Sequence, residues 1–212
     1  MKKLFLWGSV AAGIILLLLI LVKISDTDSN TDTTLDTPIS ANEHIKGNPD
    51  ARLTLVEYSD FQCPACSGAA QMIKQLGKDF EQDIKIVYRH FPLQQIHDQA
   101  ELAAYAAEAA GNQGDFWDMH DVLFNTQPQW SGNPEAQLFF IQLAESIGLE
   151  KEQFIQDMDS AKVKATVDAN YKSGMTAKIP GTPTFFLNGQ IIQTPRSYDA
   201  FKTLIKETLE NS

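Results

Sequence analysis

Two cysteines lie three positions apart in the stretch SDFQCPACSG, residues 59–68, and the 212-residue chain contains no others. Two thiols at this spacing can form a structural disulfide, supply half of a zinc site, or exchange disulfide bonds with another molecule. A structural disulfide between Cys63 and Cys66 would add little stability, because closing so short a loop contributes only roughly 2 kcal/mol before strain is subtracted. The pair is therefore a poor structural crosslink.

A zinc site would need two ligands besides the cysteines. The chain has no second cysteine pair, and its histidines do not occur at the spacing of zinc-binding pairs. His120 falls on an aromatic helical face, where a histidine that belongs to the core is the usual explanation. Zinc stays the lesser alternative, and we expect no metal ion and no cofactor. The histidines considered are His44, His90, His97 and His120.

The position of the cysteines favours redox chemistry. The segment RLTLVEYS, residues 52–59, predicts a strand, and a helix is expected from Pro64 to about Phe80, with the proline at the first helical position. Cys63 then lies at the helix N-terminus, where free amides and the macrodipole stabilise a thiolate and lower its pKa. Cys66, one turn further and more deeply buried, would resolve the mixed disulfide that Cys63 forms with a substrate.

The remaining elements predict a mixed α/β fold. DIKIVYRHF, residues 83–91, is expected to be a second strand, which makes a right-handed βαβ unit with a parallel pair. Residues 93–177 are expected to be helical almost throughout, including a helix capped by Asn133 with Pro134 at its first position. A hairpin follows at residues 182–193, with its turn at Asn188-Gly189, and then a last helix at residues 197–211. This order predicts one mixed sheet with helices on both faces.

Four stretches resemble the DsbA-like thiol-disulfide oxidoreductases of the thioredoxin superfamily, in the order in which that family has them. They are VEYSDFQCPAC, YRHFPL, FWDMHDVLF and IPGTPTFFLNG. The resemblance covers about residues 43–212 and implies a thioredoxin fold, a central mixed β-sheet flanked by helices, with an inserted helical domain. We accordingly expect a DsbA-like domain over residues 42–212, with the helical insertion at about 93–177.

The resemblance also implies a cis peptide bond at Thr182-Pro183, in a loop that faces the cysteines. There Pro183 belongs to the catalytic site, and the exposed backbone of Thr182 binds an extended substrate chain by strand addition. From the residues alone, Gly181-Thr182-Pro183 would be read as a turn. Phe61, Pro64 and Ala65 are also expected to contact the substrate.

Glu57 lies six positions before Cys63, inside an otherwise apolar strand. It matches the family's buried acid beneath the active site, which implies that it transfers a proton to and from Cys66. Phe61 and Gln62 are expected to line the rim. Ala65 stands where the best-known DsbA has a histidine, which implies a weaker oxidant.

The N-terminal sequence predicts a membrane anchor. Residues 4–22 run nineteen positions without a charge, which as a helix is roughly 28 Å, close to the thickness of a hydrocarbon core. No small-residue cleavage site follows, so a retained anchor over residues 1–24 is favoured over a cleaved signal peptide. Two lysines precede the run, which leaves the N-terminus in the cytoplasm and the domain outside. Residues 25–41, rich in Ser, Thr and Asp, are expected to form a flexible linker.

The formal net charge of −10 argues against nucleic-acid binding. The favoured function is an extracytoplasmic oxidase that donates a disulfide to reduced or unfolded exported proteins. The resemblance implies recharging by a quinone-linked membrane partner of the DsbB or vitamin-K-epoxide-reductase type. A reductase or disulfide isomerase with the same cysteines is the first alternative, and a non-catalytic, chaperone-like binding module is the second. We expect a monomer, because the linker is too short to form the dimerisation domain common in isomerases of this fold.

Overall fold

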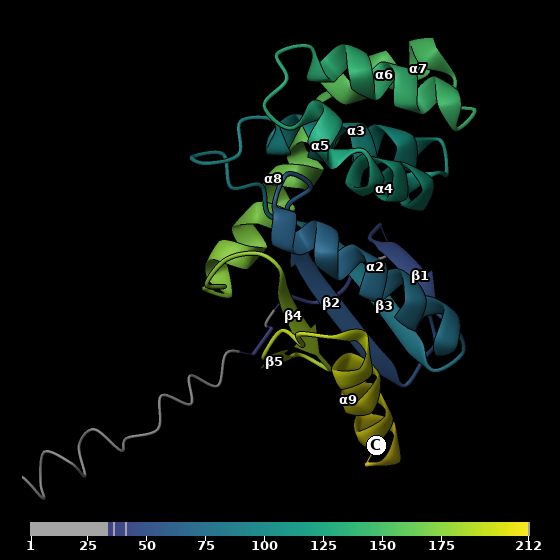
Figure 1. Cartoon of the computed structure of the whole chain (residues 1–212), viewed down its shortest axis with the longest axis vertical. Coiled ribbons are helices and arrows are strands. Elements are labelled where there is room, and N and C mark those ends of the chain that lie inside the picture. Colours follow the sequence, from purple (N-terminus) through teal and green to yellow (C-terminus); the bar gives the residue numbers. More distant parts are fainter. Residues whose placement is uncertain (1–33, 36, 41, 212) are drawn as a thin grey trace, which may run out of the picture. The chain divides into compact units, whose positions relative to one another are not determined.

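The computed structural model describes residues 34, 35, 37–40 and 42–211, and its centre is a mixed sheet (Figure 1). Within these residues the sheet has five strands in the order β1-β3-β2-β4-β5. β2 and β3 are parallel, whereas each of the other neighbouring pairs is antiparallel. The strands are β1 His44–Gly47, β2 Leu53–Ser59, β3 Ile84–His90, β4 Thr184–Leu187 and β5 Gln190–Ile192.

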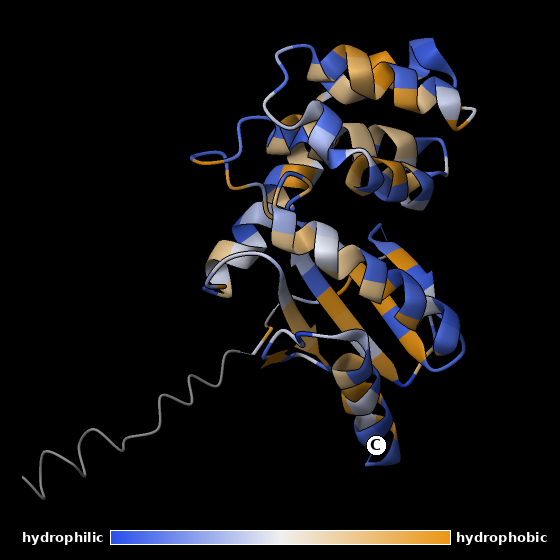
Figure 2. Cartoon of the chain, viewed as in Figure 1, coloured by the Kyte–Doolittle hydropathy of each residue, from blue (hydrophilic) through white to orange (hydrophobic). Residues whose placement is uncertain are grey.

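The parallel pair and the helix between its strands form the predicted βαβ unit. Helix α2, Pro64–Asp79, connects β2 to β3. The register runs from Leu53 opposite Ile84 to Ser59 opposite His90. Both strands are buried at six of their seven positions, as expected for central strands that are covered on both faces. Figure 2 shows hydrophobic residues in both strands, interrupted by hydrophilic ones.

Each face of the sheet packs on helices. On one face, apolar residues of β2, β3 and β4 contact α2 and the C-terminal helix α9, Tyr198–Glu210. On the other face, Val56, Tyr58 and Phe186 belong to a buried cluster against which Tyr171 of α8 packs. The predicted layer of helices on both faces is confirmed.

The segment between β3 and β4 is helical, as predicted. Its core combines the alanines of α3 with buried aromatic side chains such as Phe116, Trp130 and Phe140. The predicted start of one helix, with Asn133 as its N-cap, is wrong, because α6 begins at Ala136. The Asn133 side chain instead accepts a 2.9 Å hydrogen bond from the Glu135 amide in the turn before the helix. The helices are α3 Ala100–Asn112, α4 Phe116–Asn125, α5 Gln127–Trp130, α6 Ala136–Ser146, α7 Lys151–Asp159 and α8 Ala161–Thr176.

The hairpin β4–β5 closes the sheet with the predicted two-residue turn. Asn188 and Gly189 have φ angles of 47° and 82°, and a turn of this type needs positive φ at both positions. The Asn188 side chain also accepts a 2.8 Å hydrogen bond from the Thr54 amide, which ties the turn to β2.

The described residues just before β1 pack on the sheet, and we call residues 34, 35 and 37–40 the strap. The Leu35 amide donates a 2.8 Å hydrogen bond to the Gly189 carbonyl, and Leu35 and Ile39 pack on the face that α8 covers. The expectation of a flexible linker up to residue 41 is therefore wrong for the strap. The apolar side chains of Leu35 and Ile39 hold the strap in place by packing on the hydrophobic face of the sheet. The strand β1, which follows the strap, was also absent from the prediction.

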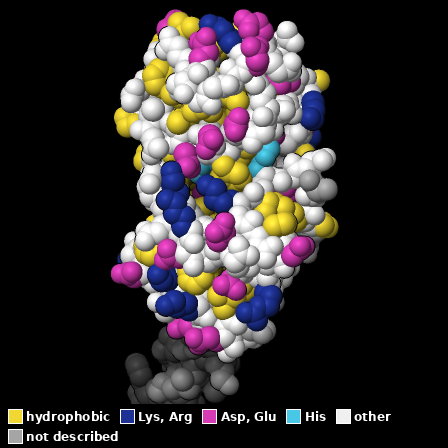
Figure 3. Space-filling model, turned by 90° about the vertical axis from the view of Figure 1, so that its right-hand side faces the viewer, with side chains coloured by type: hydrophobic (Ala, Val, Ile, Leu, Met, Phe, Trp, Pro, Cys, Tyr) yellow, Lys and Arg dark blue, Asp and Glu magenta, His cyan; other side chains and the backbone are white. Residues whose placement is uncertain are grey.

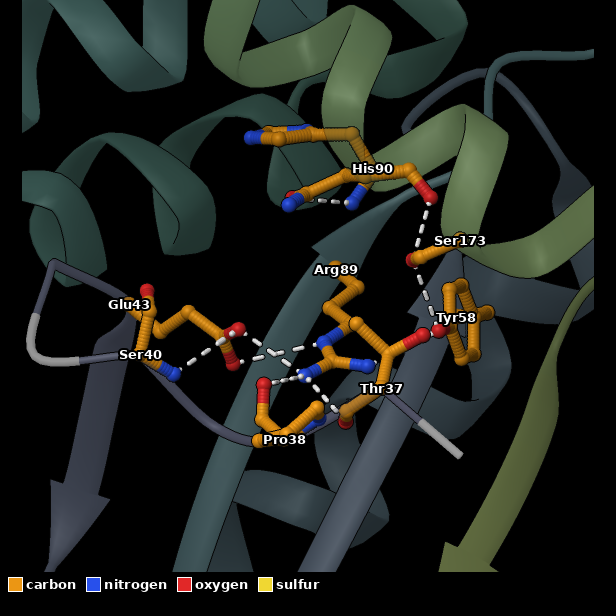
Figure 4. Close-up of polar contacts among 9 residues, drawn as sticks. Thr37, Pro38, Ser40, Glu43, Tyr58, Arg89, His90 and Ser173 are labelled. Atoms are coloured by element: carbon orange, nitrogen blue, oxygen red, sulfur yellow. Dashed lines mark hydrogen bonds and ion pairs between the residues drawn. The ribbon is translucent and has the colours of Figure 1, made fainter. Parts of the chain in front are cut away.

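A buried arginine joins the strap to the sheet (Figure 4). The Arg89 guanidinium donates 3.2 Å hydrogen bonds to the carbonyls of Thr37 and Pro38. It also donates to the Glu43 carboxylate at 2.9 Å and to the Tyr58 hydroxyl at 2.9 Å. A buried guanidinium needs such partners, and much of its charge is compensated by one carboxylate.

The expected membrane anchor, residues 1–24, and residues 25–33 of the expected linker lie outside the described residues. Among the residues that are described, no helix has both the length and the apolar character needed to cross a bilayer.

Candidate active site

Cys63 lies at the junction of β2 and α2. It is the N-cap residue of α2, with φ −73° and ψ 122°, and Pro64 occupies the first turn of the helix. No side chain caps this helix start, and its first turn carries no acidic residue. The free amides therefore face the sulfur, as the sequence predicted. Cys63 is 8% exposed to solvent, whereas Cys66 is fully buried, and both are free thiols.

The surroundings of Cys63 favour its thiolate. A hydrogen bond from the Cys66 thiol is the largest cause that lowers the pKa of Cys63, and the amides of Cys66 and Ala65 and the side chain of Thr182 add to it. Burial opposes these contacts, but together they lower the pKa from 9.0 to about 5. Cys63 is therefore an ionised nucleophile at neutral pH.

Cys66 has the opposite character. Burial is the main cause that raises the pKa of its thiol well above 9.0, and the charges of Cys63 and Glu57 raise it further. Cys66 thus stays protonated while it donates to the Cys63 thiolate. This asymmetry suits one sulfur that attacks and one that resolves.

The loop before β4 faces the cysteine pair. The Thr182-Pro183 peptide bond is cis, and Cys63 Sγ lies 3.6 Å from the carbonyl oxygen of Thr182. Two threonine hydroxyls hold this loop: Thr184 donates to the Gly181 carbonyl at 2.7 Å, and Thr194 donates to the Pro183 carbonyl at 3.2 Å. The structure therefore brings the predicted loop and the predicted nucleophile into contact.

Glu57 lies beneath the pair, in the central strand β2. Its side chain is 1% exposed, and burial raises its pKa from 4.5 to about 7, against a weak opposing effect of Ser59. Its charge acts on Cys66, so the two groups are close enough to influence each other. A carboxyl group with this pKa can both donate and accept a proton near neutral pH.

Not every predicted contact residue lies at the surface. Pro64 and Ala65 are exposed beside Cys63, as a substrate contact requires. Phe61 is only 1% exposed, and its ring packs on Phe124 with centroids 4.9 Å apart, so it does not lie at the rim. Gln62 is also buried, and it donates a 2.8 Å hydrogen bond to Asp98.

Two residues that sequence reasoning missed hold the turn before Cys63. Asp60 is buried and accepts hydrogen bonds from the Gln62 amide at 2.7 Å, from the Leu93 amide at 2.8 Å and from the His97 ring at 2.7 Å. An aspartate directly after a strand and at the first position of such a turn is a signal that could have been used. Gln127 donates to the Phe61 and Cys63 carbonyls at 2.7 and 3.1 Å, and nothing in the sequence indicates this contact.

The histidines have hydrogen-bonding partners of their own. His44 and His90 both lie within hydrogen-bonding distance of Glu108 Oε1, at 3.1 and 2.8 Å. Burial lowers the pKa of His120, whose Nδ1 lies 3.0 Å from Asp121. In the described part of the chain, no three histidine, cysteine or acidic side chains gather in a way that could hold a metal ion.

Figure 3 shows the charged side chains on one face of the molecule. On the face shown in Figure 3, lysine and arginine side chains are interspersed with acidic ones and form no continuous basic stripe. This face accordingly offers no track for a phosphate backbone.

Comparisons with known proteins agree with this geometry. A family model described as thioredoxin matches residues 40–207. The structure of oxidised BdbD from Bacillus subtilis superposes with a TM-score of 0.74 at 25% identity, covering 84% of this chain and 99% of that one. The structure of α-DsbA1 from Wolbachia pipientis has the same fold, with a TM-score of 0.72 at 20% identity, covering 85% of this chain and 97% of that one.

Curated relatives match this chain over a part of their own length. The Na⁺/H⁺ antiporter NhaA 1 of Salinispora arenicola is 37% identical over 148 residues, which is 70% of this chain and 22% of that protein. NhaA 1 of Mycolicibacterium gilvum is 40% identical over 152 residues, or 70% of this chain and 24% of that protein. The chain thus spans about a quarter of the length of these relatives.

The expected fold is confirmed: a mixed sheet flanked by helices, with a helical segment between β3 and β4. Within this fold, the Cys63 thiol lies at a helix start, opposite a cis-proline loop. The chain belongs to the thioredoxin family, and its fold is that of BdbD and α-DsbA1.

Proposed function

We propose that the protein works as an oxidase, which donates the Cys63-Cys66 disulfide to other proteins. The observation that carries this direction is the stabilised thiolate of Cys63, whose pKa is lowered to about 5. This stabilisation exists only in the dithiol form. It therefore favours reduction of the pair, which makes the disulfide form a stronger oxidant.

The size of the effect follows from the pKa. At pH 7, a thiol with a pKa lowered from 9.0 to about 5 gains about 2.7 kcal/mol in the reduced state. For a two-electron couple this corresponds to a reduction potential about 60 mV higher than that of an unperturbed pair. The shift is in the oxidising direction and amounts to less than half of the roughly 150 mV that separates thioredoxin from DsbA.

The reaction starts with attack on Cys63 Sγ, the more accessible sulfur of the pair. A substrate thiolate attacks Cys63 Sγ, the Cys63-Cys66 bond breaks, and Cys66 leaves as a thiolate and takes up a proton, for which Glu57 is the donor. A second substrate thiolate then attacks the substrate sulfur of the mixed disulfide. The Cys63 thiolate leaves, so the substrate has lost two electrons and the protein has gained them.

The substrates we propose are reduced or unfolded exported proteins. The backbone of Thr182 lies beside Cys63 Sγ, where an extended chain could add to it and present its cysteine. Pro64 and Ala65, which follow Cys63 directly, are exposed and could contact the chain next to that cysteine.

We further propose that residues 1–24 anchor the protein with its N-terminus in the cytoplasm and its domain outside. The uncharged run of residues 4–22 and the two lysines before it support this topology. In that place a quinone-linked membrane oxidase of the DsbB or vitamin-K-epoxide-reductase type would reoxidise the pair. Protease added to spheroplasts should then digest the domain, and full protection would contradict this orientation.

The deciding experiment measures the reduction potential of the Cys63-Cys66 pair against glutathione. We expect a value well above the roughly −270 mV of thioredoxin, together with oxidation of reduced ribonuclease. A value near that of thioredoxin would contradict the oxidase direction. Faster recovery of scrambled than of reduced ribonuclease would favour an isomerase. Biological function retained in Cys63→Ala would favour a chaperone-like module.

A further inference from the structure

A buried tyrosine links the centre of the sheet to the end of α8. The hydroxyl of Tyr58, in the central strand β2, lies 2.8 Å from Ser173 Oγ (Figure 4). Arg89 Nη1 donates a 2.9 Å hydrogen bond to the same hydroxyl. Tyr58 is fully buried and takes no part in the reaction steps proposed above.

The members at the two ends of this chain of hydrogen bonds fix its direction. The Arg89 guanidinium can only donate, so the Tyr58 oxygen accepts there. Ser173 Oγ donates to the Asn170 carbonyl at 2.7 Å. The Tyr58 hydroxyl is therefore left to donate its own proton to Ser173 Oγ. Hydrogen bonds that run in one direction polarise and strengthen one another.

The strap and Glu43 hold the first member of the chain. Arg89 donates to the carbonyls of Thr37 and Pro38 and to the Glu43 carboxylate. These contacts fix the place of the guanidinium (Figure 4). They therefore also fix the direction from which Arg89 approaches the Tyr58 hydroxyl.

The end of α8 leads directly into the loop that carries Thr182. Residues 177–181 connect the two, and the Ile179 amide donates a 3.2 Å hydrogen bond to the Gly174 carbonyl of α8. Ile179 also packs against the buried cluster that contains Tyr58. The position of the helix end is therefore passed on to the loop over a few residues.

Helix α8 lies close to the sheet at this point. Gly174 has no side chain, and a Cβ there would lie 2.6 Å from the ring of Phe91 and 3.2 Å from the ring of Tyr58. A hydrogen bond across so short a distance determines how the helix end is placed over the strand. The bond between Tyr58 and Ser173 is such a contact.

Tyr58 also contacts the element at the other end of the loop. Its backbone pairs with Thr184, the first residue of β4. The Thr184 hydroxyl donates to the carbonyl of Gly181, the residue before Thr182, at 2.7 Å. Tyr58 thus contacts both elements that flank the loop, α8 through its hydroxyl and β4 through its backbone.

We propose that Tyr58 is a positioning residue for substrate binding: its hydroxyl, oriented by Arg89, holds the end of α8 and so keeps the Thr182 backbone where an extended chain can pair with it. The Thr182 carbonyl lies 3.6 Å from Cys63 Sγ, so a displaced loop would hold the substrate cysteine away from the sulfur. The inference rests on the strand addition proposed above for Thr182. A small reagent, which needs only the sulfur, does not depend on the loop.

Two activated disulfides with the same leaving group separate these cases. The reduced full-length protein in mild detergent reacts either with dipyridyl disulfide or with a peptide whose single cysteine carries the pyridyl disulfide. In both reactions the Cys63 thiolate attacks the activated disulfide, a new disulfide bond forms, and thiopyridone leaves with the electron pair of the broken bond. The absorbance of thiopyridone gives the two second-order rate constants.

We expect the peptide rate constant to fall about three- to tenfold in Tyr58→Phe and in Ser173→Ala, as for the loss of one hydrogen bond. The rate constant for dipyridyl disulfide should stay the same. Both variants remove the same bond, so the double variant should lose no more than Tyr58→Phe alone. Unchanged peptide constants, an equal fall for both reagents, or losses that multiply in the double variant would each overturn the proposal.

Thr166→Ala is the matched control for Ser173→Ala. Thr166 also lies in α8, but its hydroxyl donates to the Lys162 carbonyl of the same helix. Its loss should leave both rate constants unchanged, and a fall like that of Ser173→Ala would attribute the effect to the helix itself and refute the role of Tyr58. If Tyr58→Phe does not fold, Ser173→Ala decides, since Ser173 is only partly buried.

Peptides methylated at single backbone amides separate this inference from the one on which it rests. Each amide next to the cysteine is methylated in turn, which removes one hydrogen-bond donor. We expect the wild type to react more slowly with at least one of these peptides, and Tyr58→Phe to discriminate less. If the wild type reacts equally with all of them, strand addition to Thr182 is wrong and the present inference falls with it. If both proteins discriminate equally, strand addition stands and only the role of Tyr58 is refuted.

Discussion

Replacing Cys66 tests what makes Cys63 reactive. In Cys66→Ala the thiol that donates to the Cys63 thiolate is gone, whereas the start of helix α2 and its amides stay. Cys66→Ser keeps a donor of similar size at the same place. The pair of variants therefore separates the contribution of this hydrogen bond from that of the helix start.

The expected shift follows from the energy of a hydrogen bond to a charged group, which is about 1.5 to 3 kcal/mol. At 1.36 kcal/mol for each pKa unit, its loss should raise the pKa of Cys63 by about 1 to 2 units. Starting from about 5, the Cys66→Ala variant should titrate between about 6 and 7. The Cys66→Ser variant should stay near the wild-type value.

The rate of alkylation of Cys63 by iodoacetamide, measured from pH 3 to pH 9 by mass spectrometry, reports its thiolate fraction. In the single-cysteine variants Cys63 is the only thiol that can react. If Cys66→Ala titrates near pH 5, like Cys66→Ser, the helix amides and Thr182 set the pKa and the reasoning is refuted. A pKa near 9 in both variants would instead deny any special environment.

Three further predictions concern stability, measured as the free energy of unfolding in urea. The pKa of Glu57 is raised from 4.5 to about 7 in the folded state, so its stabilising contribution is complete below pH 4.5 and lost as the pH rises through about 7. Between pH 4.5 and pH 8 the wild type should therefore lose about 3 kcal/mol relative to Glu57→Gln, and parallel pH profiles would contradict this. Glu43→Ala should lower the free energy of unfolding by about 3 kcal/mol, because it leaves the buried Arg89 without its carboxylate partner. Glu43→Gln keeps a neutral acceptor and should lower it by less. Equal losses in the two variants would exclude the carboxylate charge as the cause. Gly174→Ala should lower the free energy of unfolding by about 2 kcal/mol, because the added Cβ would lie 2.6 Å from the ring of Phe91. Gly68→Ala, a helical position with open space around it, should raise that free energy by about 1 kcal/mol. A gain in both variants would show that the Phe91 ring can move aside.

Patterns with local causes could be predicted from the sequence. The strand before Cys63, the helix that starts at Pro64 and the Asn188-Gly189 turn each depend on neighbouring residues, and all three are present. The cysteine pair could be assigned for the same reason, because spacing and the helix start lie within one short stretch. The contact of Thr182 with Cys63 joins residues 119 positions apart, so only the family resemblance could indicate it.

The features that could not be predicted from the sequence depend on contacts between residues that are far apart along the chain. Phe61 looks like a rim residue because it stands next to the active-site turn, yet the aromatic rings of the helical segment cover it. The strap has the composition of a tether, and only the buried Arg89 and the apolar face of the sheet give it a fixed place. Neither partner is visible in the local sequence.

The strap also determines where the domain can be cut. The family match begins at residue 40, six positions after Thr34, the first of the described residues, which pairs with Gln190. A truncated protein that starts at the family boundary would keep Glu43 but lose the Thr37 and Pro38 carbonyls, and would uncover apolar surface on the sheet. A soluble version for crystallisation or redox titration should therefore begin at or before residue 34.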